Sequence, residues 1–536
     1  MNMGISEKKG FQPLLVAVIL CIGLVAGYFY RSAKTMNNPG ISPSRNNVLL
    51  EALDYIRAEY VDTVSEKKLT EAAIIAMLDS LDPHSVFIPA ADLKEYTEPL
   101  EGKFSGIGIQ FNMQNDTVVV IRTILNGPSE KIGIRPGDRI VKINDTLVAG
   151  IKMSTHQIMR KLKGIKGTKV KVGIKRFSVD HLVDFIITRD EIPLNSIDVS
   201  FMAEHGTGVI KISEFSRRTY EEFMNAVDRL NRQGLKKMIL DLRDNGGGYM
   251  NAAVDIADEF LPDGDLIVFT QGRANPRRDL YATRKGRLEN IPLIVLMNEW
   301  SASASEILSG ALQDNDRAMI IGRRSFGKGL VQQQVELSDG SAVRLTVARY
   351  FTPSGRCIQK PYSHGKENYF DELNQRYQNG EFFNPDSIIP LDTLSYTTKK
   401  GRKVYGGGGI MPDVFIPHDT SFVSPFYSKV VSMGLLYKFA FNYSDANRVI
   451  LSQFNDPYSI EKFLTGKKIF NQFLEYCSQQ KVLASSSDLK KSGNYLRVQL
   501  FANIARYILD NEGYYPLLLQ IDYGMKKAIE YHMINK

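Results

Sequence analysis

Short apolar segments alternate with helical patterns through the middle of the chain, and this alternation constrains the fold more than any other feature of the sequence. The apolar segments lie at 208–212, 237–242, 292–297, 318–321 and 343–349. Between the second and the third, residues 250–260 place Ala253, Ile256, Ala257 and Phe260 on one face of a predicted helix. Strands that alternate with helices are typical of layered α/β domains. We therefore expect a layered core over residues 191–420, with the polar stretch 362–404 as a loop or insertion.

The chain on either side of this core has a different character. Residues 101–190 carry β-like segments at 106–109, 117–121, 139–143, 169–174 and 182–187, with one predicted helix at 154–162. Apolar residues recur at helical spacing over 47–100 and again over 421–536. A chain of 536 residues is too long for one core. The predicted fold class is multidomain α+β: an N-terminal helical region, a small β domain, the layered α/β core and a helical C-terminal extension.

An uncharged apolar run occupies residues 11–30, directly after Lys8, Lys9 and Gly10. About twenty helical residues can span the hydrocarbon of a bilayer, and positive charges favour the cytoplasmic side. We expect residues 1–10 in the cytoplasm, a transmembrane signal anchor at 11–30 and a linker at 31–46. The rest would lie outside the cytoplasm, on the periplasmic side of the inner membrane. The alternative is a cleaved signal peptide, because Ala26 and Gly27 are small residues suited to a cleavage site.

Composition argues against several classes of function. The 67 basic and 59 acidic residues are interspersed, and the net charge of +8 forms no basic stripe of the kind that binds nucleic acid. Hydrophobic residues make up 43% of the chain, which excludes a mostly disordered protein. Cys357 and Cys477, in the part predicted to be exported, are too few for a disulfide framework and lack metal-ligand spacing. We expect no cofactor and no metal.

Three glycines, Gly246, Gly247 and Gly248, follow an apolar segment and stand just before a predicted helix. Backbone N–H groups at such a junction can approach a ligand oxygen closely, aided by the partial positive charge of the helix N-terminus. An anion hole, a phosphate cradle or a simple tight turn would each suit the pattern. It lacks both the lysine-serine ending of a P-loop and the full dinucleotide-binding motif.

A second junction carries three serines, Ser301, Ser303 and Ser305, from an apolar segment to the start of a predicted helix. A serine in this place can be a nucleophile. It can equally be a helix cap, because Ser303 and Glu306 have the spacing of a capping box. Spacing alone does not choose among the three serines.

A lysine in an apolar context could supply the base that a serine nucleophile needs. Lys328 lies between two glycines and close to Phe326 and Leu330. Desolvation lowers the pKa of a lysine, and a neutral amine can accept the proton of a serine. Gln332 is four residues further on, where it shares the face of Lys328 in either a helix or a strand. The alternative for an isolated lysine is a solvated surface charge.

Asp82, His84 and Ser85 have the residue types of a catalytic triad. Side chains so close in sequence do not normally converge in the order that a triad requires. We interpret them as a turn in which the Asp and Ser side chains bond to the backbone.

Residues 126–138 (NGPSEKIGIRPGD) resemble a PDZ domain, and Gly106, Ile107, Gly108 and Ile109 stand where that domain has its carboxylate-binding loop. A loop flanked by glycines can direct N–H groups at the terminal carboxylate of a peptide, and the adjoining strand edge can accept the peptide as an added strand. The resemblance implies a PDZ domain over 101–190 that binds the C-terminal tails of proteins. The alternative is a small β domain with ordinary glycine turns.

Taken in order along the chain, LDPHS, the PDZ pattern, DLRDNGGG, SASASE, FGKGLVQ and GGGGIMPD resemble the C-terminal processing peptidases, also called tail-specific proteases. The resemblance implies a crotonase/Clp-like layered core, with Ser303 as nucleophile, Lys328 as general base and Gln332 as the residue that supports it. It also implies an oxyanion hole of backbone N–H groups, for which Gly247 and Ala304 are the expected donors. The expected reaction is endopeptidase cleavage of exported proteins near their tails, through an acyl-enzyme on the serine.

Two functions of other classes compete with this one. A non-catalytic PDZ scaffold would be expected to have lost the serine or the lysine, yet Ser303 and Lys328 are both present. A crotonase-like acyl-transfer enzyme suits an exported chain with a peptide-binding module poorly. The expected partners are peptide tails as substrate and the membrane through residues 11–30; a homo-oligomer or an adaptor is also compatible with the sequence, and nucleic acid is not expected.

Overall fold

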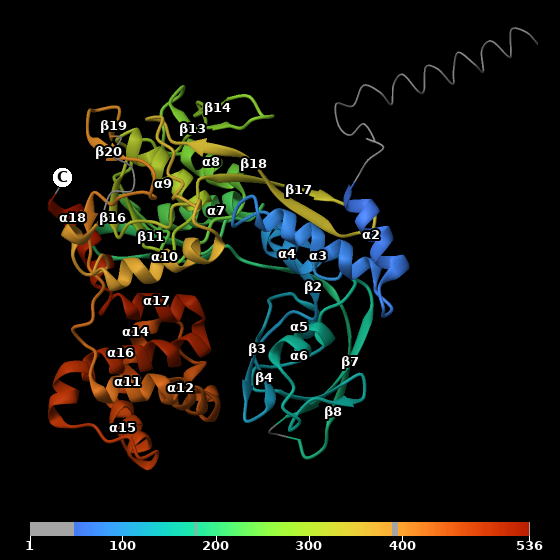
Figure 1. Ribbon diagram of the computed structural model, residues 1–536. Helices are drawn as coiled ribbons and strands as arrows, with labels where there is room; N and C mark the ends of the chain where they lie inside the picture. Colours follow the sequence, from blue (N-terminus) through green and yellow to red (C-terminus); the bar gives the residue numbers. More distant parts are fainter. Residues whose placement is uncertain (1–47, 177–178, 389–394, 535–536) are drawn as a thin grey trace, which may run out of the picture. The chain divides into compact units, whose positions relative to one another are not determined.

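The computed structural model describes residues 48–176, 179–388 and 395–534 (Figure 1). Residues up to 74 belong to one compact unit and those from 75 onward to a second. The first unit contains α2 (Val48–Glu59) and most of α3 (Glu66–Asp79). The predicted cytoplasmic segment, signal anchor and linker lie outside the described residues. Within those ranges, no helix is both long and apolar enough to cross a membrane.

The small β domain contains a sheet of strand order β3-β4-β5-β7-β8, with β6 beside β5. Its elements are β2 (Lys103–Gly106), β3 (Ile109–Gln114), β4 (Thr117–Thr123), α5 (Pro128–Lys131), β5 (Arg139–Ile143), β6 (Thr146–Leu147), α6 (Thr155–Leu162), β7 (Lys169–Lys175), β8 (Val183–Thr188) and β9 (Asp190–Pro193). The predicted strand 106–109 is in fact divided, because Gly106 ends β2 and Ile109 begins β3. Buried side chains such as Val118, Ile140 and Ile158 form the core of this domain. Strand β3 lies at one edge of the sheet, and no described strand pairs with its outer side.

The layered core contains a sheet of strand order β10-β11-β12-β15-β16-β21. The strands are β10 (Ile197–Met202), β11 (Thr207–Ile212), β12 (Lys237–Asp241), β15 (Leu293–Met297), β16 (Met319–Gly322) and β21 (Val414–Phe415). Strand β10 is antiparallel to β11, and the other neighbours are parallel. Parallel strands with both faces covered consist of nearly continuous apolar residues, and the sequence of β15 shows this pattern.

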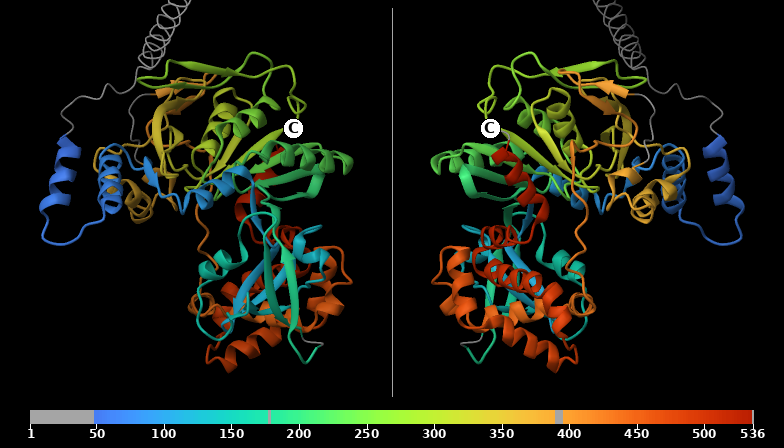
Figure 2. Two further views of the ribbon diagram at one scale, coloured as in Figure 1. Left: turned by 90° about the vertical axis from the view of Figure 1, so that its right-hand side faces the viewer. Right: turned by 90° about the vertical axis from the view of Figure 1, so that its left-hand side faces the viewer.

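Helices cover both faces of this sheet. On one face lie α7 (Thr219–Arg232), α8 (Met250–Asp258) and α9 (Ala304–Asp314), packed in one buried cluster with the strands. On the other face, Met525, Ala528 and Ile529 of α18 (Tyr523–Ile534) pack with Ile239 and Ile294. Figures 1 and 2 show α18, in red, beside the green strands. The layered core therefore includes a helix from the predicted C-terminal extension and does not end at residue 420.

A second sheet combines one strand that precedes the β domain with four strands from the core sequence. It runs in the order β1-β18-β13-β14, with β17 also paired to β18. Its strands are β1 (Val86–Ile88), β13 (Leu266–Gln271), β14 (Arg278–Tyr281), β17 (Leu330–Glu336) and β18 (Ala342–Phe351), and α4 (Leu93–Glu101) follows β1. Because β1 pairs with β18, the turn that precedes it reaches β17, which carries Gln332.

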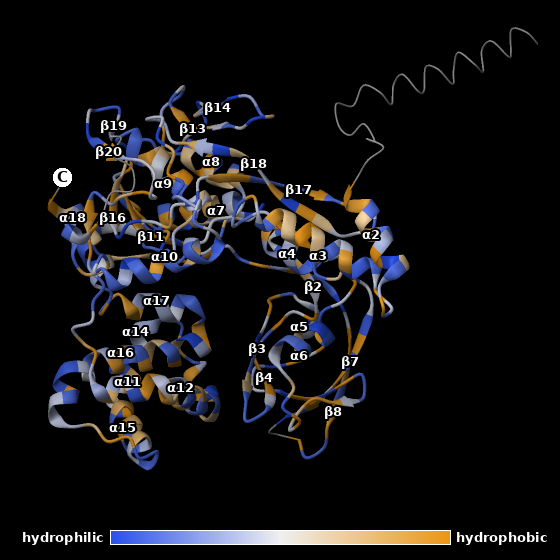
Figure 3. Cartoon of the chain, viewed as in Figure 1, coloured by the Kyte–Doolittle hydropathy of each residue, from blue (hydrophilic) through white to orange (hydrophobic). Residues whose placement is uncertain are grey.

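The prediction of a loop over 362–404 is wrong for much of that segment. It contains α10 (Lys366–Gln378), a 3-10 turn η2 (Pro385–Ser387), β19 (Ser395–Thr397) and β20 (Lys403–Tyr405). Helix α10 is mainly blue in Figure 3 because most of its residues are polar, and only Tyr369 and Arg376 are buried. Hydrogen bonds to other segments, not a broad apolar face, hold this helix on the core. The guanidinium of Arg376 donates to the carbonyls of Ser325 and Arg324.

The remaining C-terminal residues form a group of helices with a core of its own. These helices are α11 (Pro425–Ser432), α12 (Leu435–Ala446), α13 (Arg448–Leu451), α14 (Pro457–Gly466), α15 (Ile469–Gln479), α16 (Ser486–Leu509) and α17 (Asn511–Leu518). Phe473, Leu500 and Phe501 are among the side chains buried there.

Candidate active site

Three serines surround the start of α9, and the structure separates their roles. Ser301 and Ser305 are fully buried, and their hydroxyls donate to the carbonyls of Leu242 and Asn245. Ser303 is partly exposed and has φ +56° with ψ −113°, a backbone conformation that residues other than glycine rarely adopt. Only Ser303 of the three is open to a substrate.

A buried carboxylate holds this serine beside the lysine. Glu306 Oε2 accepts from the backbone N–H groups of Ser303 and Lys328, each at 2.8 Å. Glu306 Oε1 accepts from the Ser325 hydroxyl at 2.5 Å and the Gly327 N–H at 2.7 Å. Burial raises the pKa of Glu306 to about 7, while these four donors act in the opposite direction and favour the ionised form. All four partners point a hydrogen at the carboxylate, so the geometry fits the charged state.

A tyrosine joins the same two segments. The Tyr350 hydroxyl lies 2.6 Å from the Lys328 carbonyl and 3.2 Å from the Ser303 carbonyl. Tyr350 is 1% exposed, and burial raises the pKa of its phenol well above the ordinary range. It therefore remains a neutral donor that fixes the backbone of both reacting residues.

The amine of Lys328 sits in surroundings that favour its neutral form. Burial lowers its pKa below the usual value, and the positive charge of Arg344 lowers it further, against the pull of Glu306 and Asp82. The amine donates to Gln332 Oε1 at 3.1 Å. The predicted proximity of Lys328 and Gln332 is therefore present, with Gln332 on strand β17.

The orientation of the Gln332 amide is set by a residue far away in sequence. Its Nε2 donates to the backbone carbonyl of His84. A carbonyl can only accept, so the amide must turn its NH2 group toward His84 and its oxygen toward Lys328. Sequence reasoning did not find this role for His84; the signal was the LDPHS motif upstream of FGKGLVQ.

The turn that presents the His84 carbonyl has the predicted structure. Asp82 Oδ1 accepts from the N–H groups of His84 and Ser85 at 2.8 and 2.9 Å, and Oδ2 accepts from the Ser85 hydroxyl at 2.6 Å. Ser85 Oγ accepts in turn from the N–H of Thr346, the residue paired with Gln332 across the β17–β18 ladder. Burial lowers the pKa of the His84 imidazole to about 3, so the ring is neutral.

The glycine run passes directly against Ser303. Gly247 has φ +101°, and a Cβ there would lie 2.7 Å from Ser303 Cβ and 2.9 Å from Ala304 N. Only glycine allows this approach. The Gly247 N–H, however, donates to Asn245 Oδ1 at 2.8 Å, so it is already engaged.

Two other N–H groups are better placed as oxyanion donors. Ala304 is the first residue of α9, and the helix itself cannot satisfy its N–H. Gly248 forms a parallel bridge with Phe215, which bonds to the Gly247 carbonyl and the Tyr249 N–H. Because Phe215 bonds to the residues on either side of Gly248, the N–H of Gly248 itself points away from Phe215.

The loop 106–109 in the β domain has a fixed conformation. The Ile107 carbonyl accepts from both the N–H and the hydroxyl of Ser129, at 3.1 and 2.6 Å. Gly108 has φ +71°, and its carbonyl accepts from the Ile124 N–H at 2.9 Å. The loop carbonyls are thus satisfied internally at the start of the edge strand β3.

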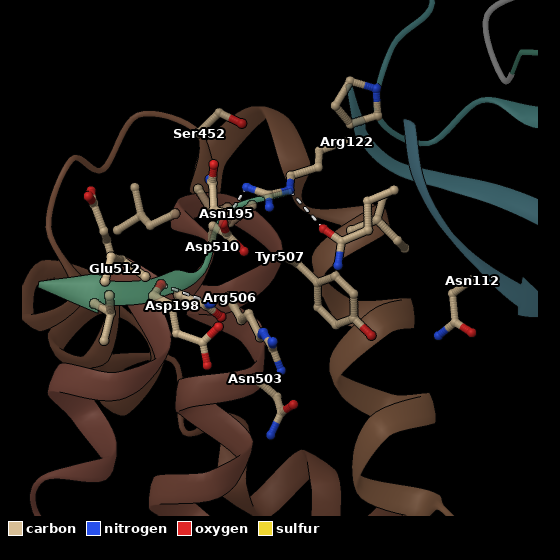
Figure 4. Close-up of a pocket in the computed structure, with 18 of the residues that line it drawn as sticks. Asn112, Arg122, Asn195, Asp198, Ser452, Asn503, Arg506, Tyr507, Asp510 and Glu512 are labelled. Carbon is tan, nitrogen blue, oxygen red and sulfur yellow. Dashed lines mark hydrogen bonds and ion pairs between the residues drawn. The ribbon is translucent and has the colours of Figure 1, made fainter. Parts of the chain in front are cut away.

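A polar cavity of about 1090 Å³ lies elsewhere, between β3 and β4 of the β domain, β10 of the core and helices α16 and α17. In Figure 4, Arg122 of β4 points toward Asp510, with which it forms an ion pair. None of the serine, lysine or glycine positions described above lines this cavity.

A partly exposed serine, a desolvated lysine and N–H groups at a helix start are the groups that a serine peptidase with an amine as its base would need. Residues 206–365 match the model of peptidase family S41, 105–186 match the PDZ domain and 426–510 match a family of unknown function. The carboxy-terminal processing protease CtpA of Bacillus subtilis is 36% identical over 318 residues, which cover 59% of this chain and 67% of that one. The carboxy-terminal-processing protease of Bartonella bacilliformis is 38% identical over 314 residues, or 58% and 71%.

Among solved structures, the photosystem II D1 C-terminal processing protease is 28% identical, with a TM-score of 0.36, over 70% of this chain and 94% of that one. The chain belongs to peptidase family S41. It is a serine endopeptidase of the carboxy-terminal processing kind with a PDZ domain, as its motifs predicted.

Replacing the central carboxylate should disable the site. Glu306→Gln keeps the size but substitutes an NH2 group for one of the two accepting oxygens, so at least one buried donor loses its acceptor. We expect a loss of about 1–3 kcal/mol in the free energy of unfolding and a fall in kcat of more than about tenfold because Ser303 and Lys328 lose their common anchor.

Urea unfolding and peptide hydrolysis measure the two effects. Glu259→Gln is the matched control, since Glu259 is a buried glutamate bonded to Tyr220 and Arg287 away from the serine. It should lose stability and keep kcat. Hydrolysis by Glu306→Gln at the rate of the unaltered enzyme would contradict the role of the carboxylate.

Proposed function

We propose that Ser303 is the nucleophile, Lys328 the general base and Gln332 the residue that orients the base, in the cleavage of protein tails. The observation that carries this proposal is the shared Glu306 carboxylate, which bonds to the backbone of both Ser303 and Lys328. The chemistry of the three side chains supports it, because a neutral amine that gives one N–H to Gln332 Oε1 keeps its lone pair for a proton.

The proposed reaction has two halves. Lys328 takes the proton of Ser303 while Oγ attacks the scissile carbonyl carbon, and the protonated amine then gives that proton to the departing nitrogen as the peptide bond breaks. Water, deprotonated by Lys328, attacks the acyl-enzyme carbonyl carbon. The protonated amine then returns that proton to Ser303 Oγ as the ester bond breaks and the new C-terminus leaves. Each tetrahedral intermediate carries a negative oxygen that needs N–H donors.

We assign these donors to the N–H groups of Ala304 and Gly248 in place of the expected pair Ala304 and Gly247. The change rests on the bond from Gly247 N–H to Asn245 and on the outward direction of the Gly248 N–H at its bridge with Phe215. Gly247 contributes by lacking a side chain, which lets the run approach Ser303. The parallel sheet with helices on both faces also supports a crotonase/Clp-like type for the core.

Substitution of the three serines tests the nucleophile. Ser303→Ala should abolish peptide hydrolysis with the fold intact, whereas Ser301→Ala and Ser305→Ala should keep substantial turnover, because their hydroxyls are committed to carbonyls. Melting temperature is measured beside kcat, since each serine also contributes to the helix start. Equal loss at all three positions would refute the assignment.

Two lysine variants complete that test. Lys328→Ala has no base, and Lys328→Arg has a group that does not lose its proton at working pH, so both should be inactive. In the unaltered enzyme, kcat/KM should rise with pH through an apparent pKa below the ordinary lysine value of 10.5, because the amine must be neutral to act and its pKa is lowered. An active arginine variant would rule out general-base catalysis by this residue.

We further propose that the PDZ loop 106–109 captures the free carboxylate and the apolar last residue of a substrate tail. Support comes from the free edge of β3 and the fixed loop that precedes it. Amidation of the tail of a peptide substrate should therefore raise KM several-fold and leave kcat similar, when both peptides are compared in the intact enzyme. Identical KM values would show that the loop does not read the carboxylate.

Residues 11–30 are proposed as a signal anchor that keeps the catalytic part on the periplasmic side of the inner membrane, which rests on their uncharged apolar sequence. The full chain should sediment with membranes after an alkaline carbonate wash, and deletion of residues 1–30 should release an active soluble enzyme. Release of the full chain by carbonate would contradict the anchor, and a mature N-terminus near Gly27 would indicate cleavage instead. A homo-oligomer or an adaptor stays a prediction.

A further inference from the structure

Arg243 lies between the end of β12 and the glycine run, and two carboxylates hold its guanidinium. Asp241, on the same strand, accepts from Nε at 2.8 Å and from Nη2 at 2.7 Å. Asp522, just before α18, accepts from Nη1 at 3.0 Å and from Nη2 at 2.7 Å. Burial acts to raise the pKa of Asp241, but Arg243 and Lys211 outweigh it and hold the value at about 2. The guanidinium therefore links a strand of the catalytic sheet to the C-terminal extension through charged groups.

The backbone from Arg243 to the glycine run is fixed residue by residue. The Arg243 N–H donates to Asp241 Oδ1 at 3.0 Å, and its carbonyl accepts from Lys211 Nζ at 2.8 Å. The next residue, Asp244, has φ +66° and donates its N–H to Asn298 Oδ1 at 3.0 Å. Asn298 belongs to the turn that leads into the nucleophile. A displacement of Arg243 would therefore shift Asp244, the residue before the glycine run. It would also shift the contact between the glycine run and the segment that carries Ser303.

Asp522 is held firmly by its own helix. Its Oδ1 accepts from the Met525 N–H at 2.9 Å, which caps the start of α18. Ala528 and Ile529 of the same helix are buried against the sheet that contains β12. Position 522 lies outside the residues matched by the models of peptidase family S41, the PDZ domain and the family of unknown function. The bond to Arg243 is a contribution of this chain's own C-terminal extension.

Packing alone does not fix the guanidinium. Arg243 and Asp522 both line a cavity of about 480 Å³ and another of about 340 Å³. If the Asp522 carboxylate is neutralised, Asp241 is the charged partner that remains for Arg243 among the described residues. The outer end of the Arg243 side chain then has room to move into either cavity. The position of the Arg243 guanidinium is thus set jointly by Asp241 and by the charge of Asp522, just before α18.

We infer that Asp522 is a positioning residue for the oxyanion hole, acting through Arg243 on the glycine run. The inference rests on the proposed function, since it concerns the donors assigned there to Gly248 and Ala304. It gives α18 a part in the reaction although the helix carries none of the serine, lysine or glycine positions described above.

The test uses the full chain with Asp522→Asn, because asparagine can still cap α18 but carries no charge. We expect kcat to fall about tenfold with KM nearly unchanged, as misplaced oxyanion donors weaken the transition state and leave ground-state binding alone. Asp456→Asn is the matched control. Asp456 caps α14 by accepting from the Ser459 N–H at 2.9 Å, so the same change is made at a cap without Arg243. This control should keep the kcat of the unaltered enzyme.

A second measurement separates positioning from a general loss of structure. A peptide aldehyde, whose carbon bonds to the serine oxygen and whose own oxygen occupies the oxyanion hole, should bind Asp522→Asn about tenfold more weakly. The corresponding substrate peptide should bind Ser303→Ala equally well with and without Asp522→Asn. Unchanged kcat and aldehyde affinity would overturn the inference, and so would an equal weakening of both peptides. Cleavage by Ser303→Ala itself would instead refute the proposed function.

Discussion

The Glu306 carboxylate bonds to both the segment of Ser303 and the segment of Lys328, and the geometry of the candidate site depends on it. An unpaired charge in the interior is costly, so a buried carboxylate is stable only where donors surround it. Here the four donors come from the nucleophile segment and from residues 325–328 of the lysine segment. The requirement to satisfy one buried group therefore fixes the relative position of the serine and the lysine backbones.

The other parts of the site meet for a topological reason. Strands β12 and β15 are parallel neighbours in register from Met238 with Leu293 to Asp241 with Leu296, so the glycine run and the serine turn leave the sheet at the same edge. The pairing of β1 with β18 brings the turn 82–85 to β17 from the opposite end of the sequence. Segments separated by more than two hundred residues thus contribute to one orientation, that of the Gln332 amide.

The sequence predicted those elements whose local pattern is strong. Strands β12 and β15 are continuous apolar runs, and α6 has both its cap at Ser154 and its apolar face. Helix α10 was missed because tertiary hydrogen bonds, not an apolar face, hold it. The serine and the lysine carry recognisable motifs, whereas the engagement of the Gly247 N–H by Asn245 and the bond of Gln332 to His84 are set by three-dimensional approach. The sequence pattern alone does not indicate which backbone N–H group of a glycine run has no acceptor within the fold.

The packing of α18 has a consequence for the order of events during synthesis. The strands it covers are complete once residue 415 has been made, but one face of their sheet stays apolar and open until residues 525–529 arrive. A ribosome that has produced Ser303, Lys328 and Gln332 has therefore not yet produced a fully covered sheet. The growing chain holds Ser303, Lys328 and the glycine run next to a sheet with one uncovered face until α18 emerges. The layered core is therefore complete only after residues 525–529 have been made.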